Sequence, residues 1–174
     1  AAQAQGDWQQ AVAAFRDSLD LRRQLLQRLG ATPEAMRDLS ISLNNVGKAA
    51  QAQGDWQQAG AAFRESLDLS RQLLQRLGAT PEAMRDLSVS LNNVGKAAQA
   101  QGDWQQAEAI FGESVKLSRK VLERANNTHR ALAALRFSLR LYVQAAEALG
   151  KTEQAEAAKT ELLSLDERIQ KQSR

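Results

Sequence analysis

The chain has 174 residues, of which 43% are hydrophobic and 25% are charged, so it can bury a core but cannot form several unrelated domains. It has no cysteine, which excludes disulfides and cysteine-ligated metal sites, and no apolar run approaches the ~20 residues that span a bilayer. The net charge is +3, but acidic and basic residues are interleaved. A concentrated basic face for nucleic acid is therefore not expected.

The chain opens inside a repeated segment. Ala1–Gln5 has the same sequence as residues 49–53 and 97–101, and a glycine follows each copy. A glycine after the last turn supplies the left-handed conformation that ends a helix. We therefore interpret residues 1–5 as the end of a helix whose beginning is absent, and the chain as a fragment. A cytoplasmic location is expected, although a missing signal peptide carries little weight in a fragment.

The next helix, residues 7–29, begins at an Asp-x-x-Gln pattern that recurs from Asp55 and Asp103. Aspartate accepts hydrogen bonds from the free amides of a helix start, and glutamine three residues later completes a capping box. We expect such helices, called B helices, over 7–29, 55–77 and 103–125. The apolar and small residues at helical spacing in the second copy are Ala59, Phe63, Ser66, Leu67, Ser70, Leu74 and Leu77.

The sequence Gly-Ala-Thr-Pro separates each of the first two B helices from the next helix. Glycine ends one helix, Thr80 is placed to cap the following one, and Pro81 suits its first position. We expect these helices, called A helices, over 33–53, 81–101 and 129–149. The buried stripe of the second A helix is Met84, Leu87, Leu91, Val94 and Ala98.

Residues 6–53 and 54–101 differ at only four positions, so a unit of 48 residues is repeated in tandem. No alternating β-branched run exists, and we expect an all-α solenoid of antiparallel helix pairs. A last B helix over 152–171 has one narrow apolar stripe and otherwise charged faces, which suits a terminal cap. The predicted single domain, 1–174, comprises a stub at 1–5, units at 6–53, 54–101 and 102–149, and a C-terminal capping helix within 150–174.

The segment Leu43–Leu69 resembles a tetratricopeptide repeat. That pattern places a bulky residue, a Leu-Gly-like pair and a small residue on helix A, then alanine, an aromatic residue and a small residue on helix B. The positions that match are Leu43, Val46, Gly47, Ala50, Ala59, Phe63 and Ser66. The match recurs at Leu91–Leu117 and more weakly at Leu139–Leu163, where Val143 replaces the glycine. The resemblance implies a right-handed superhelix that binds proteins and is not an enzyme.

The period departs from the familiar one of about 34 residues. The 48-residue unit would lengthen each helix by about two turns, or ~10 Å. Longer helices and a Leu-Asn-Asn start to the match resemble the kinesin-light-chain type of tetratricopeptide repeat.

In this family the A helices line a concave groove that holds a peptide or protein segment. The stripe beside the buried one on each A helix lies on a single face, and Asn45 and Asn93 align with an asparagine that often hydrogen-bonds a peptide backbone. The expected groove residues are Arg37, Ile41, Asn44, Asn45, Lys48, Arg85, Val89, Asn92, Asn93, Lys96, Phe137 and Arg140.

The chemistry of these side chains favours an acidic segment. An asparagine amide both donates to and accepts from a peptide group. Arginine can form two parallel hydrogen bonds with a carboxylate, and lysine supplies a point charge. We therefore expect an extended or helical partner segment with acidic residues. The alternative is that Asn44 and Asn92 satisfy neighbouring helix ends, while Lys48 and Lys96 are merely solvated.

Catalysis is poorly supported. The one histidine, His129, falls at a predicted helix start, and there is no phosphate-binding glycine loop and no cluster with metal-ligand spacing. We therefore expect no catalytic, cofactor or metal site, and neither nucleic acid nor membrane as a partner. Two further functions stay open, an end-to-end self-assembly module and a regulatory arm of a larger signalling protein.

Self-assembly would use the N-terminal end. The first B helix lacks most of its own A helix, so part of the apolar surface around Trp8, Val12, Phe15 and Leu19 is expected to lack a cover and to favour a homo-oligomer.

Two further residue types are expected to pack helices together. Gly47 and Gly95 lie inside A helices, where glycine costs about 1 kcal/mol against alanine, so close helix approach is expected. The tryptophans at the first turns of the B helices, Trp56 among them, are expected to plug the space between units, with ligand stacking as the alternative. Close approach does not explain Gly60 and Gly112, and Gly60 is expected at an exposed site because Val12 and Glu108 stand at its position in the other copies.

Overall fold

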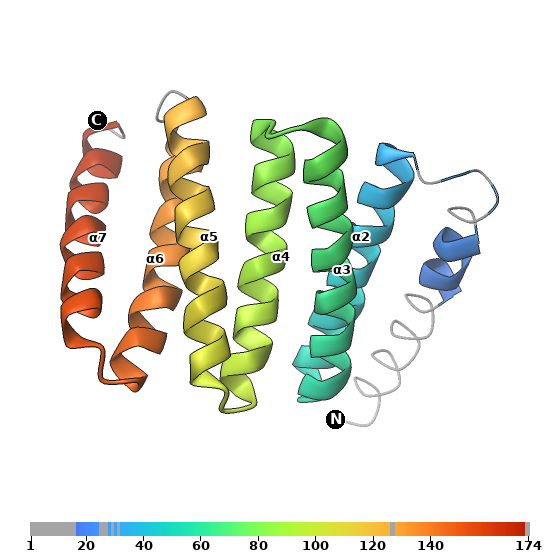
Figure 1. Ribbon diagram of the computed structural model, residues 1–174, viewed down its shortest axis with the longest axis horizontal. Helices are drawn as coiled ribbons and strands as arrows, with labels where there is room; N and C mark the ends of the chain where they lie inside the picture. Colours follow the sequence, from blue (N-terminus) through green and yellow to red (C-terminus); the bar gives the residue numbers. More distant parts are fainter. Residues whose placement is uncertain (1–16, 25–27, 29, 31, 126–127, 173–174) are drawn as a thin grey trace. The chain divides into compact units, whose positions relative to one another are not determined.

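The computed structural model describes residues 17–24, 28, 30, 32–125 and 128–172 (Figure 1). Every regular element in these residues is a helix. The chain divides into two compact units, Ala1–Gly78 and Ala79–Arg174.

The first unit contains a helical stretch at residues 17–24, α2 (Pro33–Ala52) and α3 (Trp56–Leu77). Helices α2 and α3 pack along each other. Their core includes Leu19, which is only 6% exposed. The other buried members of this core are Met36, Leu39, Leu43, Val46, Ala62, Leu69 and Leu73.

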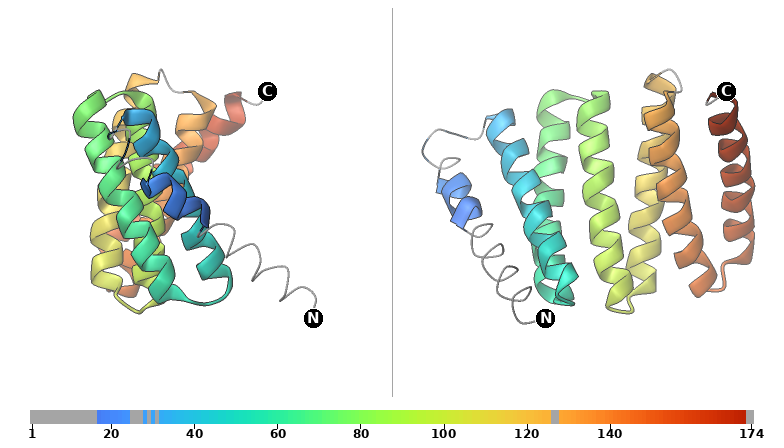
Figure 2. Two further views of the ribbon diagram at one scale, coloured as in Figure 1. Left: turned by 90° about the vertical axis from the view of Figure 1, so that its right-hand side faces the viewer. Right: turned by 180° about the vertical axis from the view of Figure 1, so that it is seen from behind.

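The second unit contains α4 (Pro81–Ala100), α5 (Trp104–Arg124), α6 (His129–Ala148) and α7 (Thr152–Gln172). Each of these helices packs on the next, and α4 also touches α6. Helix α6 lies behind α5 in Figure 1 and in front of it in the rear view of Figure 2. The unit therefore has two layers, with α4 and α6 in one and α5 and α7 in the other.

The helix boundaries follow from the capping residues expected from the sequence. The Asp55 and Asp103 carboxylates accept from the amides of Gln58 and Gln106 at 2.9 Å. Thr32 and Thr80 accept in the same way from the amides three residues later, at 3.2 Å. Glycines that follow the helices have positive φ, as Gly54 does at φ +77° between α2 and α3. The described helices end within two residues of the predicted bounds.

Gly47 and Gly95 are sites of close helix approach, as predicted. A Cβ atom on Gly95 would lie 2.3 Å from Cε1 of the fully buried Phe111, and the same distance separates such an atom on Gly47 from Phe63. The aromatic rings of α3 and α5 therefore rest directly on the backbones of α2 and α4.

The structure tests three predictions that concern single residues. The tryptophan prediction agrees with Trp104, which packs against a cluster from α4, α5 and α6. Two others are wrong. Leu77 is 37% exposed because the stripe shifts to Leu73 in the last turns of α3, and Gly60 is buried.

Serines form a buried hydrogen-bond network between the helices. In the second unit the hydroxyls of Ser88 and Ser114 lie 3.0 Å apart, and Ser114 lies 3.0 Å from Ser138. Ser40 and Ser66 form the matching pair in the first unit at 2.8 Å. Small side chains let the helices approach closely, and their mutual hydrogen bonds offset the desolvation of the hydroxyls.

The prediction of an all-α solenoid is confirmed, because consecutive helices pack on one another and no strand occurs in the described residues. Three further features stay predictions: the right-handed twist of the solenoid, its 48-residue structural period and the single domain over 1–174. No helix within the described part of the chain combines the length and apolar character needed to cross a membrane.

Candidate functional site

The second unit exposes apolar and cationic side chains together on α4 and α6. We call this surface the A face and define it by Val89, Lys96, Phe137 and Arg140. Val89 is 46% exposed and Phe137 is 45% exposed. The ammonium of Lys96 lies 4.6 Å from the centroid of the Phe137 ring, within range of a cation–π interaction. The fold thus brings together two side chains that are 41 positions apart in the sequence.

The repeat register explains why apolar side chains are exposed here. Ile41, Val89 and Phe137 follow one another at intervals of 48 residues. Each lies next to the buried stripe of its own A helix, so each is turned outward. Ile41, on α2 of the first unit, is 52% exposed. The exposed apolar position is therefore a repeated feature rather than an isolated one.

The other predicted groove residues of the first unit lie on α2 with different accessibility. Asn45 and Lys48 are exposed, whereas Arg37 and Asn44 are half-buried. On α4 of the second unit, Arg85 and Asn93 are half-buried as well, and Arg140 on α6 is exposed.

Asn92 does not belong to the exposed surface, which corrects the sequence prediction. It is 6% exposed, and its Nδ2 donates to Ser138 Oγ at 3.2 Å across α4 and α6. Its Oδ1 is buried and has no partner among the described residues. Asn92 therefore extends the buried serine network.

The A face combines two kinds of interaction. The exposed rings and methyl groups offer apolar area, and burial of such area is favourable by about 25 cal/mol per Å². Lys96 and Arg140 add positive charge beside it. This combination suits a protein segment that places an apolar side chain next to a carboxylate.

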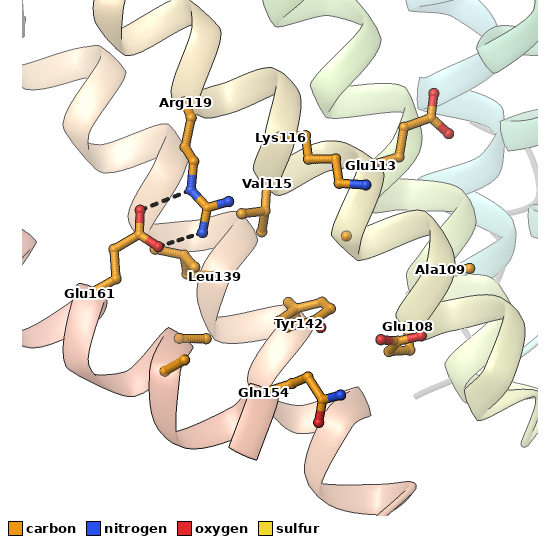
Figure 3. A pocket seen from close by; sticks show the side chains of 13 residues that line it. Glu108, Ala109, Glu113, Val115, Lys116, Arg119, Leu139, Tyr142, Gln154 and Glu161 are labelled. Atoms are coloured by element: carbon orange, nitrogen blue, oxygen red, sulfur yellow. Dashed lines mark hydrogen bonds and ion pairs between the residues drawn. The ribbon is translucent and has the colours of Figure 1, made fainter. Parts of the chain in front are cut away.

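A second concave feature was not predicted from the sequence. A hollow of about 680 Å³ lies between α5, α6 and α7, with Leu139 and Tyr142 of α6 among its lining (Figure 3). Burial, together with the charge of Glu108 and a hydrogen bond to it, raises the pKa of Tyr142. The sequence signal for this hollow is that the last repeat differs from the earlier ones at several lining positions. Glu108 and Gly112 are two of them.

The described residues give little to support catalysis. They contain no group of three or more His, Cys, Asp or Glu side chains placed to hold a metal ion. His129 is the first residue of α6 and is exposed, as predicted.

Comparison with known protein families identifies the family to which this chain belongs. Two family profiles, both described as tetratricopeptide repeat, match residues 38–120 and 1–28. The chain belongs to the tetratricopeptide repeat family. The long-repeat, kinesin-light-chain-like type proposed from the sequence is consistent with these matches. The comparison with curated proteins found no match.

Solved structures similar to this tetratricopeptide repeat protein are themselves helical repeats. The crystal structure of the de novo designed helical repeat protein DHR64 is 19% identical with a TM-score of 0.53, covering 99% of this chain and 90% of that one. The DHF58 filament is 20% identical with a TM-score of 0.51, covering 96% and 84%. At these identities the likeness shows the fold alone.

Proposed function

We propose that the protein is an interaction scaffold whose A helices bind an acidic segment of a partner protein. The family supports the scaffold role, and the A face supports this choice of ligand. The partner segment would place an apolar side chain against Phe137 and Val89 and a carboxylate near Lys96 and Arg140.

The observation that carries the proposal is the position of Lys96 over Phe137. The Phe137 ring is 45% exposed, and the Lys96 ammonium lies beside it. In this proposal a carboxylate of the partner approaches Lys96 while an apolar side chain of the partner packs on the ring. Asn93, on the same helix, would add hydrogen bonds to the backbone of the bound segment.

The first unit would contribute the equivalent positions of α2. Ile41, Asn45 and Lys48 are all exposed there. In this proposal each repeat offers one apolar contact, one amide and one cation to the partner.

Two alternatives remain part of the proposal. In the first, the chain is a self-assembly module, because helical repeats stack readily on copies of themselves. The N-terminal residues invoked for this contact, Trp8, Val12 and Phe15, lie outside the described residues, and Leu19 is buried. In the second, the chain is the regulatory arm of a larger signalling protein.

A peptide-display selection on the immobilised chain tests the main proposal. We expect enriched peptides in which aspartate or glutamate neighbours a large apolar residue. A selected peptide should bind the Phe137→Ala and Lys96→Ala variants about tenfold more weakly, which corresponds to about 1.4 kcal/mol. Asn45→Ala with Asn93→Ala should weaken it as well.

The control is Lys120→Ala, which removes an exposed lysine on α5, in the opposite layer. This variant should leave peptide affinity unchanged. If no acidic peptides are enriched, or if Phe137→Ala binds as well as the wild type, the A face is not the binding surface.

A further inference from the structure

The hollow between α5, α6 and α7 has the construction of a small-molecule site. Helices α5 and α7 form its walls, with the small residues Ala109, Gly112 and Ala157 among them, and α6 provides Leu139 and Tyr142. Figure 3 shows Tyr142 between these walls. Its volume of about 680 Å³ falls within the range of ligand pockets.

Two ion pairs connect the elements around the hollow. The guanidinium of Arg119 on α5 donates twice to the carboxylate of Glu161 on α7, at 3.1 and 2.5 Å. Lys151, just before α7, pairs with Glu108 on α5 at 3.0 Å. The two pairs join α5 to the start and to the middle of α7.

The first unit contains the matching hollow, which serves as an internal comparison. Its lining residues Leu19, Arg23, Leu43 and Glu65 lie 96 positions before Val115, Arg119, Leu139 and Glu161. Arg23 also donates twice to Glu65, at 3.1 and 2.5 Å. This hollow has only about 320 Å³.

Three substitutions between the repeats distinguish the larger hollow. Gly112 stands where the earlier copies have Arg16 and Arg64, which removes a long side chain from the α5 wall. Tyr142 replaces Val46 and Val94. A Cβ atom on Gly112 would lie 3.5 Å from the Tyr142 ring, so the ring rests close to the α5 backbone.

The third substitution reverses a charge. Lys116 stands where the earlier copies have Asp20 and Asp68, and Asp20 lines the smaller hollow. Arg119 and Lys151 are each neutralised by a glutamate. Among the described residues Lys116 has no ion-pair partner, and Figure 3 shows the Glu113 carboxylate directed away from Tyr142. Lys116 is therefore the positive charge at the rim of the hollow that is left to pair with an anionic ligand.

We propose that this hollow binds a small aromatic carboxylate. The aromatic body would lie on Leu139 and the Tyr142 ring between the small wall residues. The carboxylate would pair with Lys116, and the Gln154 amide would supply a further hydrogen bond. This site shares no residue with the A face and is independent of the proposed peptide binding.

A matched pair of probes tests both the site and the sign of its charge. 2-Naphthoate and 2-naphthylmethylammonium share the aromatic body and differ in charge. By titration calorimetry we expect naphthoate to bind one per chain, and the ammonium compound to bind about tenfold more weakly. Absence of saturable naphthoate binding, or equal affinity for the two probes, would overturn the proposal.

Variants that restore the residues of the other repeats locate the site. Gly112→Arg should fill the hollow and Lys116→Asp should repel the carboxylate, each weakening naphthoate about tenfold. Phe137→Ala, on the A face, is the control and should leave its affinity unchanged. Naphthoate binding that survives Gly112→Arg would place the ligand elsewhere.

A measurement on the wild-type chain tests the proposal even if a variant does not fold. In nuclear magnetic resonance spectra, naphthoate should shift the Tyr142 ring signals and the methyl signals of Ala109, Ala157 and Leu139. Shifts confined to Val89 and Phe137 would assign the ligand to the A face and overturn the proposal.

Discussion

Arg136 of α6 donates to Asp166 of α7 at 3.1 Å, and this ion pair occupies the place of a serine pair in the other repeats. Ser88 and Ser118, 30 residues apart like the ion pair, lie 3.0 Å from each other in α4 and α5. The side chains of Arg136 and Asp166 are 35% and 37% exposed, whereas Ser118 is 1% exposed. The last helix pair therefore keeps a side-chain contact at the same repeat positions, but a partly exposed ion pair replaces the buried hydrogen bond between two serines.

The coupling between Arg136 and Asp166 should be modest. Because both side chains are about one-third exposed, solvent screens the pair, and a double-mutant cycle with Arg136→Ala and Asp166→Ala should give about 0.5–1 kcal/mol. Urea denaturation of the four proteins measures it. A coupling above about 3 kcal/mol would mean that the pair behaves as a buried one.

The helices were predictable because their boundaries depend on local chemistry. Asp55, Thr80 and Gly54 act on amides and dihedral angles within a few residues of themselves, so the sequence contains the whole interaction. The buried stripe of α4 was predictable for the same reason, since helical spacing alone decides which residues share a face. Leu77 was misplaced because only the packing partner decides where a stripe leaves the core.

The site was predictable only in part. Exposure of Val89 and Phe137 followed from their place beside the buried stripe. Burial of Asn92 did not, because it depends on Ser138 of another helix. The contact between Lys96 and Phe137 also required the distance between α4 and α6, which no single-helix pattern contains.

Gly95→Ala should destabilise the protein although alanine favours helices. The new methyl group would lie 2.3 Å from the buried Phe111 ring, and such overpacking costs about 1–3 kcal/mol. Set against the roughly 1 kcal/mol gained in helix propensity, this leaves a net loss of up to about 2 kcal/mol, which urea denaturation measures.

Gly112→Ala provides the matched control for Gly95→Ala. Its methyl group would meet the Tyr142 ring at 3.5 Å, an ordinary contact, so the helix propensity should dominate and stability should rise by up to about 1 kcal/mol. If Gly95→Ala were as stable as Gly112→Ala, the ring of Phe111 would not be fixed against α4.

Peptide binding at the A face should weaken as salt rises. Exposed charges are screened over ~8 Å at physiological ionic strength, and Lys48 is exposed while Lys96 is half-buried. The dissociation constant of an acidic peptide, followed by fluorescence anisotropy, should therefore increase with sodium chloride. Lys48→Ala with Lys96→Ala should remove most of this dependence; a salt-insensitive complex would argue for apolar contacts alone.

Tyr142 should ionise above its ordinary pKa of 10.0. Burial raises the pKa most, and the charge of Glu108 and a hydrogen bond to it add to the effect, while Lys151 and Arg119 oppose it. The sequence contains one tyrosine, so the ultraviolet absorbance of tyrosinate reports on this residue alone. Glu108→Gln should lower the pKa part of the way toward 10.0, whereas Glu113→Gln should leave it unchanged.

The same shift makes stability depend on pH in a defined direction. Below pH 10.0 the phenol is protonated in both the folded and the unfolded chain, so it adds no pH dependence. Above that pH the unfolded chain loses the proton while folded Tyr142 retains it, so stability falls until the folded pKa is passed. Tyr142→Phe should remove this part of the decline in urea denaturation measured across the alkaline range. A decline identical in Tyr142→Phe and the wild type would show that Tyr142 is not held in its neutral form by the fold.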